Sequence, residues 1–222
     1  MYFLSFETST KIFSIALNKD EKVLRFRNLK TASVLEDSIL PTVDKLLDSA
    51  GIKFSQIDGY AIALGPGSFT SLRVGLSTIK AFAMGTGKPV VGIPSLDIVA
   101  RGVDLGDCDE ICVINDARRE KVYACFYGRQ GRTSDYLLTS IDDVLNKANG
   151  KTLFVGDAVG LYRNKLSKFL LADEKWWYPQ ARVMASLAYE RFQNKQYDDA
   201  ASLLPLYLYP QDCQVQVKTN GS

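Results

Sequence analysis

The sequence contains no histidine. This absence excludes nucleophile activation by serine–histidine–aspartate or cysteine–histidine arrangements, zinc sites of the H-E-x-x-H type and any histidine general base. A carboxylate or lysine mechanism remains open. No apolar run reaches about 18 residues, so we expect no membrane span. The formal net charge of +2 over 222 residues is too small to indicate nucleic-acid binding by itself.

The four cysteines do not form a zinc-binding pattern. Cys108 and Cys112 are spaced C-x3-C, but the chain has no second such pair and no histidine to complete a site. Cys112 and Cys125 fall on predicted strands, where a free buried cysteine is expected. The N-terminus enters an apolar strand without a basic segment, so we expect no signal peptide and a cytoplasmic protein with reduced thiols.

The stretch from Tyr60 to Met84 predicts a buried strand (60–64), a tight loop (65–70) and a helix (71–84). Ser68 and Thr70 are expected to cap the helix, and Gly85 and Gly87 to end it. Amides at a helix N-terminus can bind an anion, which makes Gly65, Gly67 and Ser68 weak candidates for a cofactor site. The loop lacks the lysine of a P-loop and the third glycine of a dinucleotide fingerprint, so a structural turn is favoured.

The remaining segments predict the same series of elements twice. Three turn-connected strands (2–7, 12–17 and 23–26) precede a helix (35–50), which Pro41 should kink or restart. The strand and helix above follow, then a strand (89–93) and a helix capped by Ser95, giving a mixed five-stranded sheet. After a polar linker (102–110), the predicted strands are 110–115, 122–127, 135–138 and 152–155, and the predicted helices are 141–148, 161–166 and 182–193. We therefore expect a duplicated unit with an N-terminal subdomain (1–103), a shortened C-terminal subdomain (110–210) and a polar tail (211–222).

Several segments resemble one protein family. The segment Gly65-Pro-Gly-Ser-Phe-Thr-Ser-Leu-Arg-Val-Gly75 closely resembles the signature G-P-G-S-F-T-G-[LV]-R-[VI]-G of the TsaB (YeaZ) family. Four further segments are similar to conserved parts of that family: Leu4–Ser9 to its I-D-T-S opening, 39–41 with 46–47 to its L-L-P helix, 116–123 to its D-A-R-R-x-x-V-Y segment, and Pro205–Leu208 to its P-x-Y-L-R ending. The chain departs from the family pattern at three positions: Glu7 stands in place of aspartate, Ser71 in place of glycine, and Tyr209 in place of the terminal arginine.

The resemblance implies an α/β fold of the actin/Hsp70-like ATPase (ASKHA) type, built from two tandem βββαβα-type subdomains with mixed sheets. TsaB-like proteins support formation of N6-threonylcarbamoyladenosine at position 37 of tRNAs that read codons beginning with A. A TsaD-type paralogue transfers the threonylcarbamoyl group and holds a metal through an H-x-x-x-H pair, which a chain without histidine cannot form. The resemblance thus implies a non-catalytic scaffold, with ATP and magnesium expected only in its partner proteins. The implied partners are the TsaD-type paralogue, a TsaE-type ATPase through the complex, a second copy of this chain when alone, and tRNA indirectly.

The contact surface implied by the resemblance lies on the two long helices of the N-terminal half. Helix 35–50 is apolar over a wide arc, and helix 71–84 carries small side chains that permit close helix approach. The stripe formed by residues such as Ile39, Leu72 and Ile79 is instead expected to face its own sheet. The candidate interface residues are Val34, Leu40, Leu47, Ser71, Arg73, Ser77, Thr78 and Ala81.

Two alternative functions stay open. One is an ATP-dependent small-molecule kinase of the same fold, for which Glu7 and Asp157 are the best-placed carboxylates; the other is a homodimeric regulator without a ligand. Asp116, Arg118 and Arg119 could form a polar site between the halves, although a solvated turn with weak ion pairs is favoured. The aromatic group 176–178 favours core packing or a domain seam over base stacking.

Overall fold

The computed structural model describes residues 1–30 and 35–209. The first sheet has the strand order β3-β2-β1-β4-β5, in which β1 pairs antiparallel with β2 and parallel with β4. This confirms the predicted mixed five-stranded sheet. Its strands are β1 (Tyr2–Glu7), β2 (Ile12–Lys19), β3 (Lys22–Lys30), β4 (Gly59–Ala63) and β5 (Val90–Ile93).

The second sheet repeats this path. Strand β6 pairs antiparallel with β7 and parallel with β10, as β1 does with β2 and β4. Its order is β11-β10-β6-β7-β8, with β9 also paired to β7, so β9 holds the position of a third strand. The two-residue strands β8 and β11 were not predicted, because two residues carry no readable periodicity. The strands are β6 (Glu110–Arg118), β7 (Lys121–Gly128), β8 (Gly131–Arg132), β9 (Leu137–Ser140), β10 (Thr152–Val155) and β11 (Leu170–Leu171).

The helices follow the predicted order with shifted ends, except that the predicted helix 161–166 shares only Leu161 with the observed one, because residues 162–166 form turns. The observed helices are α1 (Leu35–Asp48), α2 (Phe69–Thr86), α3 (Ser95–Arg101), α4 (Ile141–Lys147), α5 (Ala158–Leu161) and α6 (Ala181–Gln193), with short 3-10 turns η1 (Phe54–Gln56) and η2 (Glu174–Trp176). Helix α1 continues through Pro41, which lies on its exposed side, where water can satisfy the carbonyl freed by the missing amide. Helix α2 includes Gly85, and only Gly87, with φ +65°, ends it. Ser95 is the first residue of α3 rather than its cap.

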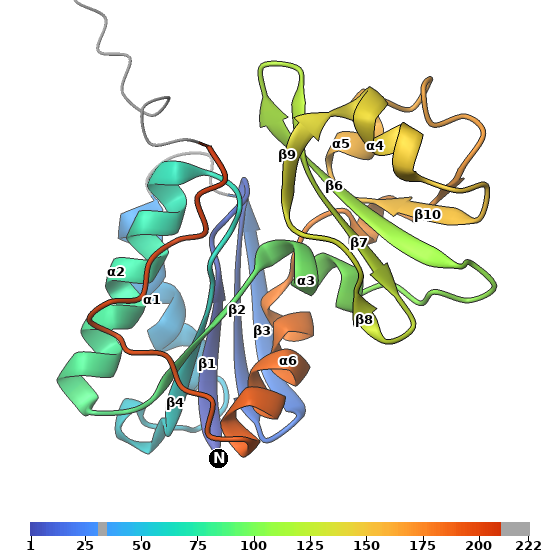
Figure 1. Ribbon diagram of the computed structural model, residues 1–222. Coiled ribbons are helices and arrows are strands. Elements are labelled where there is room, and N and C mark those ends of the chain that lie inside the picture. The colour runs from blue at the N-terminus through green and yellow to red at the C-terminus, as the bar shows by residue number, and fades with distance from the viewer. Residues whose placement is uncertain (31–34, 210–222) are drawn as a thin grey trace, which may run out of the picture.

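Helices cover both faces of the first sheet (Figure 1). Helices α1 and α2 pack with one face in an apolar core that includes Ile39, Leu76 and Ile79. Helix α6 packs against the other face through Met184 and Ala188. A separate core fills the second sheet, and residues of α3 join it, so α3 connects the two halves. None of the helices in the described part of the chain is both long and apolar enough to cross a bilayer.

The chain returns to the first sheet after crossing the second (Figure 1). Helix α6 packs against β1, β2 and β5. Beyond it, Asp198 bridges to Val90, and the amide of Leu206 donates to the carbonyl of Leu64 at 2.8 Å. The two sheets lie on either side of the predicted linker (102–110), but the predicted C-terminal subdomain (110–210) includes these residues that pack on the first sheet. The predicted tail (211–222) lies outside the described residues.

Candidate functional site

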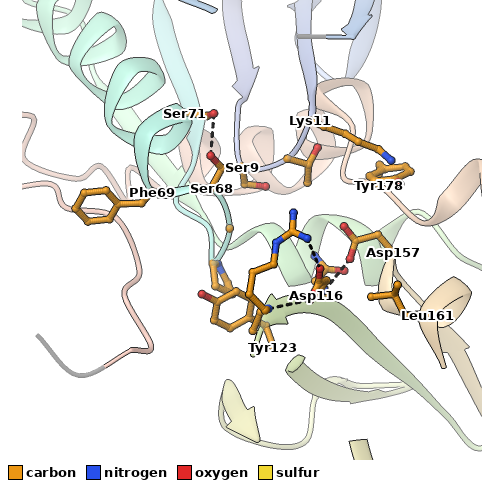
Figure 2. A pocket seen from close by; sticks show the side chains of 16 residues that line it. Ser9, Lys11, Ser68, Phe69, Ser71, Asp116, Tyr123, Asp157, Leu161 and Tyr178 are labelled. Carbon is orange, nitrogen blue, oxygen red and sulfur yellow. Dashed lines mark hydrogen bonds and ion pairs between the residues drawn. The ribbon is translucent and has the colours of Figure 1, made fainter. Parts of the chain in front are cut away.

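A cavity of about 680 Å3 lies between the two halves, at the carboxyl ends of the central strands. The loops that follow β1, β4 and β10 reach it, together with the last residues of β6 itself, Asn115–Arg118. Side chains of both charge signs line it, and Figure 2 shows Lys11 beside Tyr178 on one side and Asp116 near Asp157 on the other. Crevices at the carboxyl ends of strands are where α/β folds commonly bind ligands.

The first-half wall of the cavity depends on close backbone contact. A β-carbon on Gly67 would lie 2.2 Å from the carbonyl oxygen of Ser9, which leaves no room for any side chain. The amide of Ser68 donates to that same carbonyl at 2.7 Å. Gly65 adopts φ +87°, a conformation that favours glycine. Gly67 is therefore needed for the close backbone contact and Gly65 for its backbone conformation, in keeping with a structural turn.

Ser68 occupies the N-cap position of α2, as predicted, but its hydroxyl does not bond a helix amide. It instead forms a hydrogen bond of 2.9 Å with the hydroxyl of Ser71, which Figure 2 shows at the cavity edge. Ser68 and Gly67 line the cavity, whereas Gly65 is not among the residues that line it. The structure thus places two of the three loop candidates at the cavity wall.

Glu7 is fully buried and does not line the cavity. Its carboxyl group accepts hydrogen bonds from the amide of Ser9 and, at 3.3 Å, from the hydroxyl of Ser95. Burial raises the pKa of Glu7 to about 7, and the hydrogen bonds from Ser9 and Ser95 oppose that rise. Glu7 therefore joins the end of β1 to the start of α3, and its nomination as a cofactor ligand was wrong because its side chain points into the protein.

The second-half wall carries two carboxylates that are accessible from the cavity. The backbone amide of Asp116 donates to Asp157 at 2.8 Å, and Asp116 in turn accepts from the amide of Arg118 at 2.8 Å. The guanidinium of Arg118 lies 3.1 Å from the other carboxylate oxygen of Asp116. Burial raises the pKa of Asp157. Asp116 and Arg118 are thus both a hydrogen-bonded turn and part of the polar site between the halves.

Two buried polar atoms in the cavity wall have no hydrogen-bond partner within the described part of the chain. They are the hydroxyl of Ser9 and the side-chain oxygen of Asn115. An unpaired buried polar atom costs free energy, so both atoms suit a bound polar molecule or water. Ser9 ends the segment Leu4–Ser9 that resembles the family's opening, whereas no sequence pattern singled out Asn115, which lies inside β6. No group of three acidic or cysteine side chains among residues 1–30 and 35–209 is placed to hold a metal ion.

The aromatic group 176–178 divides between core and cavity. Trp177 is buried in the core of the second sheet and donates its indole N–H to the carbonyl of Ala172 at 3.0 Å. Tyr178 lines the cavity, where the Lys11 ammonium lies 5.1 Å from its ring centre. Tyr178 therefore lies at the predicted domain seam, and Trp177 packs in the core.

The predicted interface residues do not all lie on one open surface. Ser77 and Ala81 are exposed on α2, and Leu40 is 56% exposed on α1. Leu47 is only 3% exposed and packs in the core of the first sheet, so it cannot meet a partner there. The prediction that Leu47 meets a partner was wrong, because the wide apolar arc of α1 packs in the core of the first sheet. Val34 lies outside the described residues.

The other three interface candidates already interact within the chain. The hydroxyl of Ser71 bonds Ser68, and that of Thr78 donates to the carbonyl of Val74 at 3.0 Å. The guanidinium of Arg73 lies 3.7 Å from the centre of the Phe69 ring and donates to the Tyr207 hydroxyl at 3.1 Å. The exposed candidates in the described part of the chain are therefore Leu40, Ser77, Ala81 and Arg73, and Arg73 is the one among them that is held by contacts within the chain.

Comparison with known proteins gives consistent matches over most of the chain. The family model of the tRNA N6-adenosine threonylcarbamoyltransferase, TsaD, matches residues 30–203. The tRNA threonylcarbamoyladenosine biosynthesis protein TsaB of Haemophilus influenzae is 27% identical over 219 residues, which cover 92% of each chain. The protein of the same name from Escherichia coli is 26% identical over 219 residues and 94% of each chain.

A solved structure has the same fold. YeaZ from Pseudomonas aeruginosa superposes with a TM-score of 0.80 at 24% sequence identity, covering 93% of this chain and 99% of that one. This match, together with the duplicated mixed sheets, confirms the predicted α/β fold of the actin/Hsp70-like type.

Proposed function

The chain belongs to the TsaD family, and we propose that within it the chain acts as a non-catalytic partner subunit in the formation of N6-threonylcarbamoyladenosine on tRNA. Its similarity to two TsaB proteins named for this biosynthesis, over more than nine-tenths of each chain, is the observation that carries the proposal. The lack of histidine supports the non-catalytic part, because the metal-binding pair implied for the catalytic paralogue cannot be formed. We propose a TsaD-type paralogue as the direct partner, with a TsaE-type ATPase and tRNA joining through that complex.

We propose that the outer surface of α1 and α2 is where the paralogue docks, or a second copy of this chain in its absence. Both helices cover the same face of the first sheet, and their outward sides carry the exposed Leu40 and a row of small residues, Ser77 and Ala81. Exposed apolar side chains next to small ones allow two helix pairs to approach closely. Because tRNA and these partners are cytoplasmic, we also propose a cytoplasmic location.

The test is light scattering after size exclusion, with the chain mixed with a purified TsaD-type protein from the same source. The expected result is a stable mixed complex, which Leu40→Glu and Ala81→Glu weaken without a loss of folded structure. Leu170→Glu is the matched control, because Leu170 is 52% exposed on the second half, close to the 56% of Leu40. Absence of a complex for the unaltered chain, with and without ATP, contradicts the proposed function. Equal weakening by all three variants contradicts the proposed surface.

We propose further that this chain holds no tightly bound nucleotide. Glu7 lies outside the cavity wall, which leaves Asp116 and Asp157 as the accessible carboxylates. Those two side chains are also what favours the alternative, a kinase of the same fold with a magnesium nucleotide in the cavity. Steady ATP turnover by the isolated chain, abolished by Asp157→Asn, would establish the kinase instead. A homodimer that binds neither the paralogue nor ATP would instead support a homodimeric regulator without a ligand.

A further inference from the structure

The turn between β6 and β7 is strained in a way that glycine would relieve. Arg118 pairs with Lys121 across the hairpin, so Arg119 and Glu120 form a two-residue turn. Arg118, Arg119 and Glu120 have φ values of 66°, 51° and 61°. Residues with side chains adopt this left-handed region at an energetic cost, and such turns favour Asn-Gly. The sequence therefore keeps two arginines where local stability favours small residues, which indicates a use for their side chains.

Both arginines border a second cavity, of about 320 Å3, next to the one described above. Its walls are rich in aromatic side chains: Phe69, Tyr123, Tyr207 and Tyr209. The rings of Phe69 and Tyr207 are 5.4 Å apart, and those of Tyr123 and Tyr209 are 6.2 Å apart in an edge-on arrangement. Figure 2 shows Phe69 pointing away from the side of the cleft that holds Asp157. We call this the aromatic pocket.

Arg73 supports the wall of the aromatic pocket that Phe69 and Tyr207 form. The guanidinium of Arg73 stacks on Phe69 and donates to the hydroxyl of Tyr207, so these three side chains brace one another. Across the pocket, the hydroxyl of Tyr209 donates to the carbonyl of Ala117 at 2.9 Å. These contacts fix aromatic rings from α2, β7 and the C-terminal segment around one space.

The charged side chains that line the aromatic pocket are the arginines Arg118 and Arg119, and both can reach a ligand. Within residues 1–30 and 35–209, no carboxylate oxygen lies within 4 Å of a side-chain nitrogen of Arg119. Arg118 pairs with Asp116, but it is 87% exposed, and exposed ion pairs are weak. Guanidinium groups bind phosphate through paired hydrogen bonds, and aromatic rings stack with nucleobases. A volume of 320 Å3 is at the small end for ligand pockets and suits one nucleotide, not a duplex.

We propose that the aromatic pocket binds one nucleotide of a single-stranded RNA segment, with the base among the aromatic rings and a phosphate against Arg118 and Arg119. This adds a direct RNA contact to the proposed function, and the choice of RNA over a free nucleotide rests on that function. The small net charge of +2 agrees with a local contact, since binding a long stretch of backbone needs a larger basic surface.

The test compares two glycine substitutions in the same turn, with a short fluorescent oligoadenylate as the probe. Arg119→Gly removes a cation and relieves strain, so we expect the affinity to fall about tenfold, the salt slope of binding to fall by about 0.7, and the melting temperature to rise by about 3 °C. Glu120→Gly is the matched control: it relieves the neighbouring strain and removes no cation. It should raise the melting temperature similarly and bind the probe as well as the unaltered chain or better.

A second variant tests the aromatic walls. Phe69→Ala should weaken probe binding about tenfold or more, which is the scale of losing one stacked base. Equal binding by Arg119→Gly and Glu120→Gly overturns the proposal, as does an unaltered chain that binds no oligoadenylate. Displacement of the probe by an equal concentration of AMP assigns the pocket to free nucleotide and also overturns it. Arg119→Gly should still form the complex with the TsaD-type protein, so loss of RNA binding and loss of the proposed partner are distinguishable.

Discussion

In each half of the molecule, the loop after one parallel strand places a glycine against a backbone carbonyl of the neighbouring segment, which is just past β1 in the first half and within β6 in the second. A β-carbon on Gly67 would lie 2.2 Å from the carbonyl oxygen of Ser9, and one on Gly156 would lie 2.1 Å from that of Ile114. The carboxylates next to these contacts differ. Glu7 is sealed inside the first half, whereas Asp157 lies at the cavity wall in the second.

The turns beside these contacts differ in the same direction. In the first half, Thr8 and Ser9 are buried against loop 65–68 and α2, where a β-carbon on Gly75 would meet Thr8 at 2.3 Å. In the second half, the turn of Arg118 and Arg119 is exposed. The comparison teaches that a duplicated backbone can keep one contact in both copies while one copy uses the surrounding side chains for packing and the other presents them to a ligand.

The largest expected effect tests what the halves share. Gly156→Ala should lower the free energy of unfolding by about 4 kcal/mol, because the methyl group overlaps a backbone oxygen and φ is +118°. Gly67→Ala lacks the unfavourable φ and should cost about 3 kcal/mol. Urea unfolding measures both. Gly150→Ala is the control, since nothing lies within 4 Å of the place its methyl group would take, and it should cost little. If neither Gly67→Ala nor Gly156→Ala lowers the free energy of unfolding, the close glycine contact does not stabilise either half.

The next effect distinguishes the buried carboxylate of Glu7 from the cavity-lining carboxylate of Asp157. The pKa of Glu7 is raised to about 7 in the folded chain from an ordinary value of 4.5, so the folded state holds its proton more tightly than the unfolded state. The contribution of Glu7 to the free energy of unfolding is therefore fully present below about pH 4.5. It falls by about 3 kcal/mol in all as the pH rises to about 7. Unfolding measured from pH 5 to pH 8 should show this fall, and Glu7→Gln should reduce it strongly. An unchanged profile in the variant would mean that another group causes it.

A smaller effect is expected at the open carboxylate. Asp157→Ala removes the acceptor for the backbone amide of Asp116 and should lower stability by about 1 kcal/mol. Asp157→Asn keeps a side-chain oxygen as the acceptor and should lose less than half as much. Thermal unfolding at pH 7 compares them. The same loss from both variants would indicate that charge, not the hydrogen bond, holds this loop.

The last comparison is between the two turns, with expected shifts no larger than that of Asp157→Ala. Glu120→Gly should stabilise the chain by about 1 kcal/mol, because φ is +61° at that position. Thr10→Gly should instead destabilise by about 1 kcal/mol. Residues 8–11 adopt no positive φ, so glycine adds freedom to the unfolded chain, and the substitution removes the hydroxyl that accepts from the amide of Ile12 at 3.2 Å. Differential scanning calorimetry measures both shifts. Shifts of the same sign would remove the contrast between a packed turn and a strained one.

Much of the fold could be predicted because its signals are local. Apolar alternation indicated the central strands, helical spacing indicated α1 and α2, and the recurrence of element order indicated the duplication. The family resemblance rested on a continuous segment, 65–75, which needs no three-dimensional information. The tightness of the backbone at Gly67 was also readable, since a glycine between a strand and a helix commonly allows close approach.

The sequence by itself determined the order of elements, the fold class and the family, because periodicity and motifs are properties of neighbouring residues. Only the tertiary structure decided which apolar faces were already covered. It buried Leu47 and Glu7, laid α6 and the segment after it on the first sheet, and brought Phe69, Tyr123 and Tyr209 around one pocket with Arg119. A pattern of side chains tells which face of an element must be buried, but the partner of that face comes from residues far away in the chain.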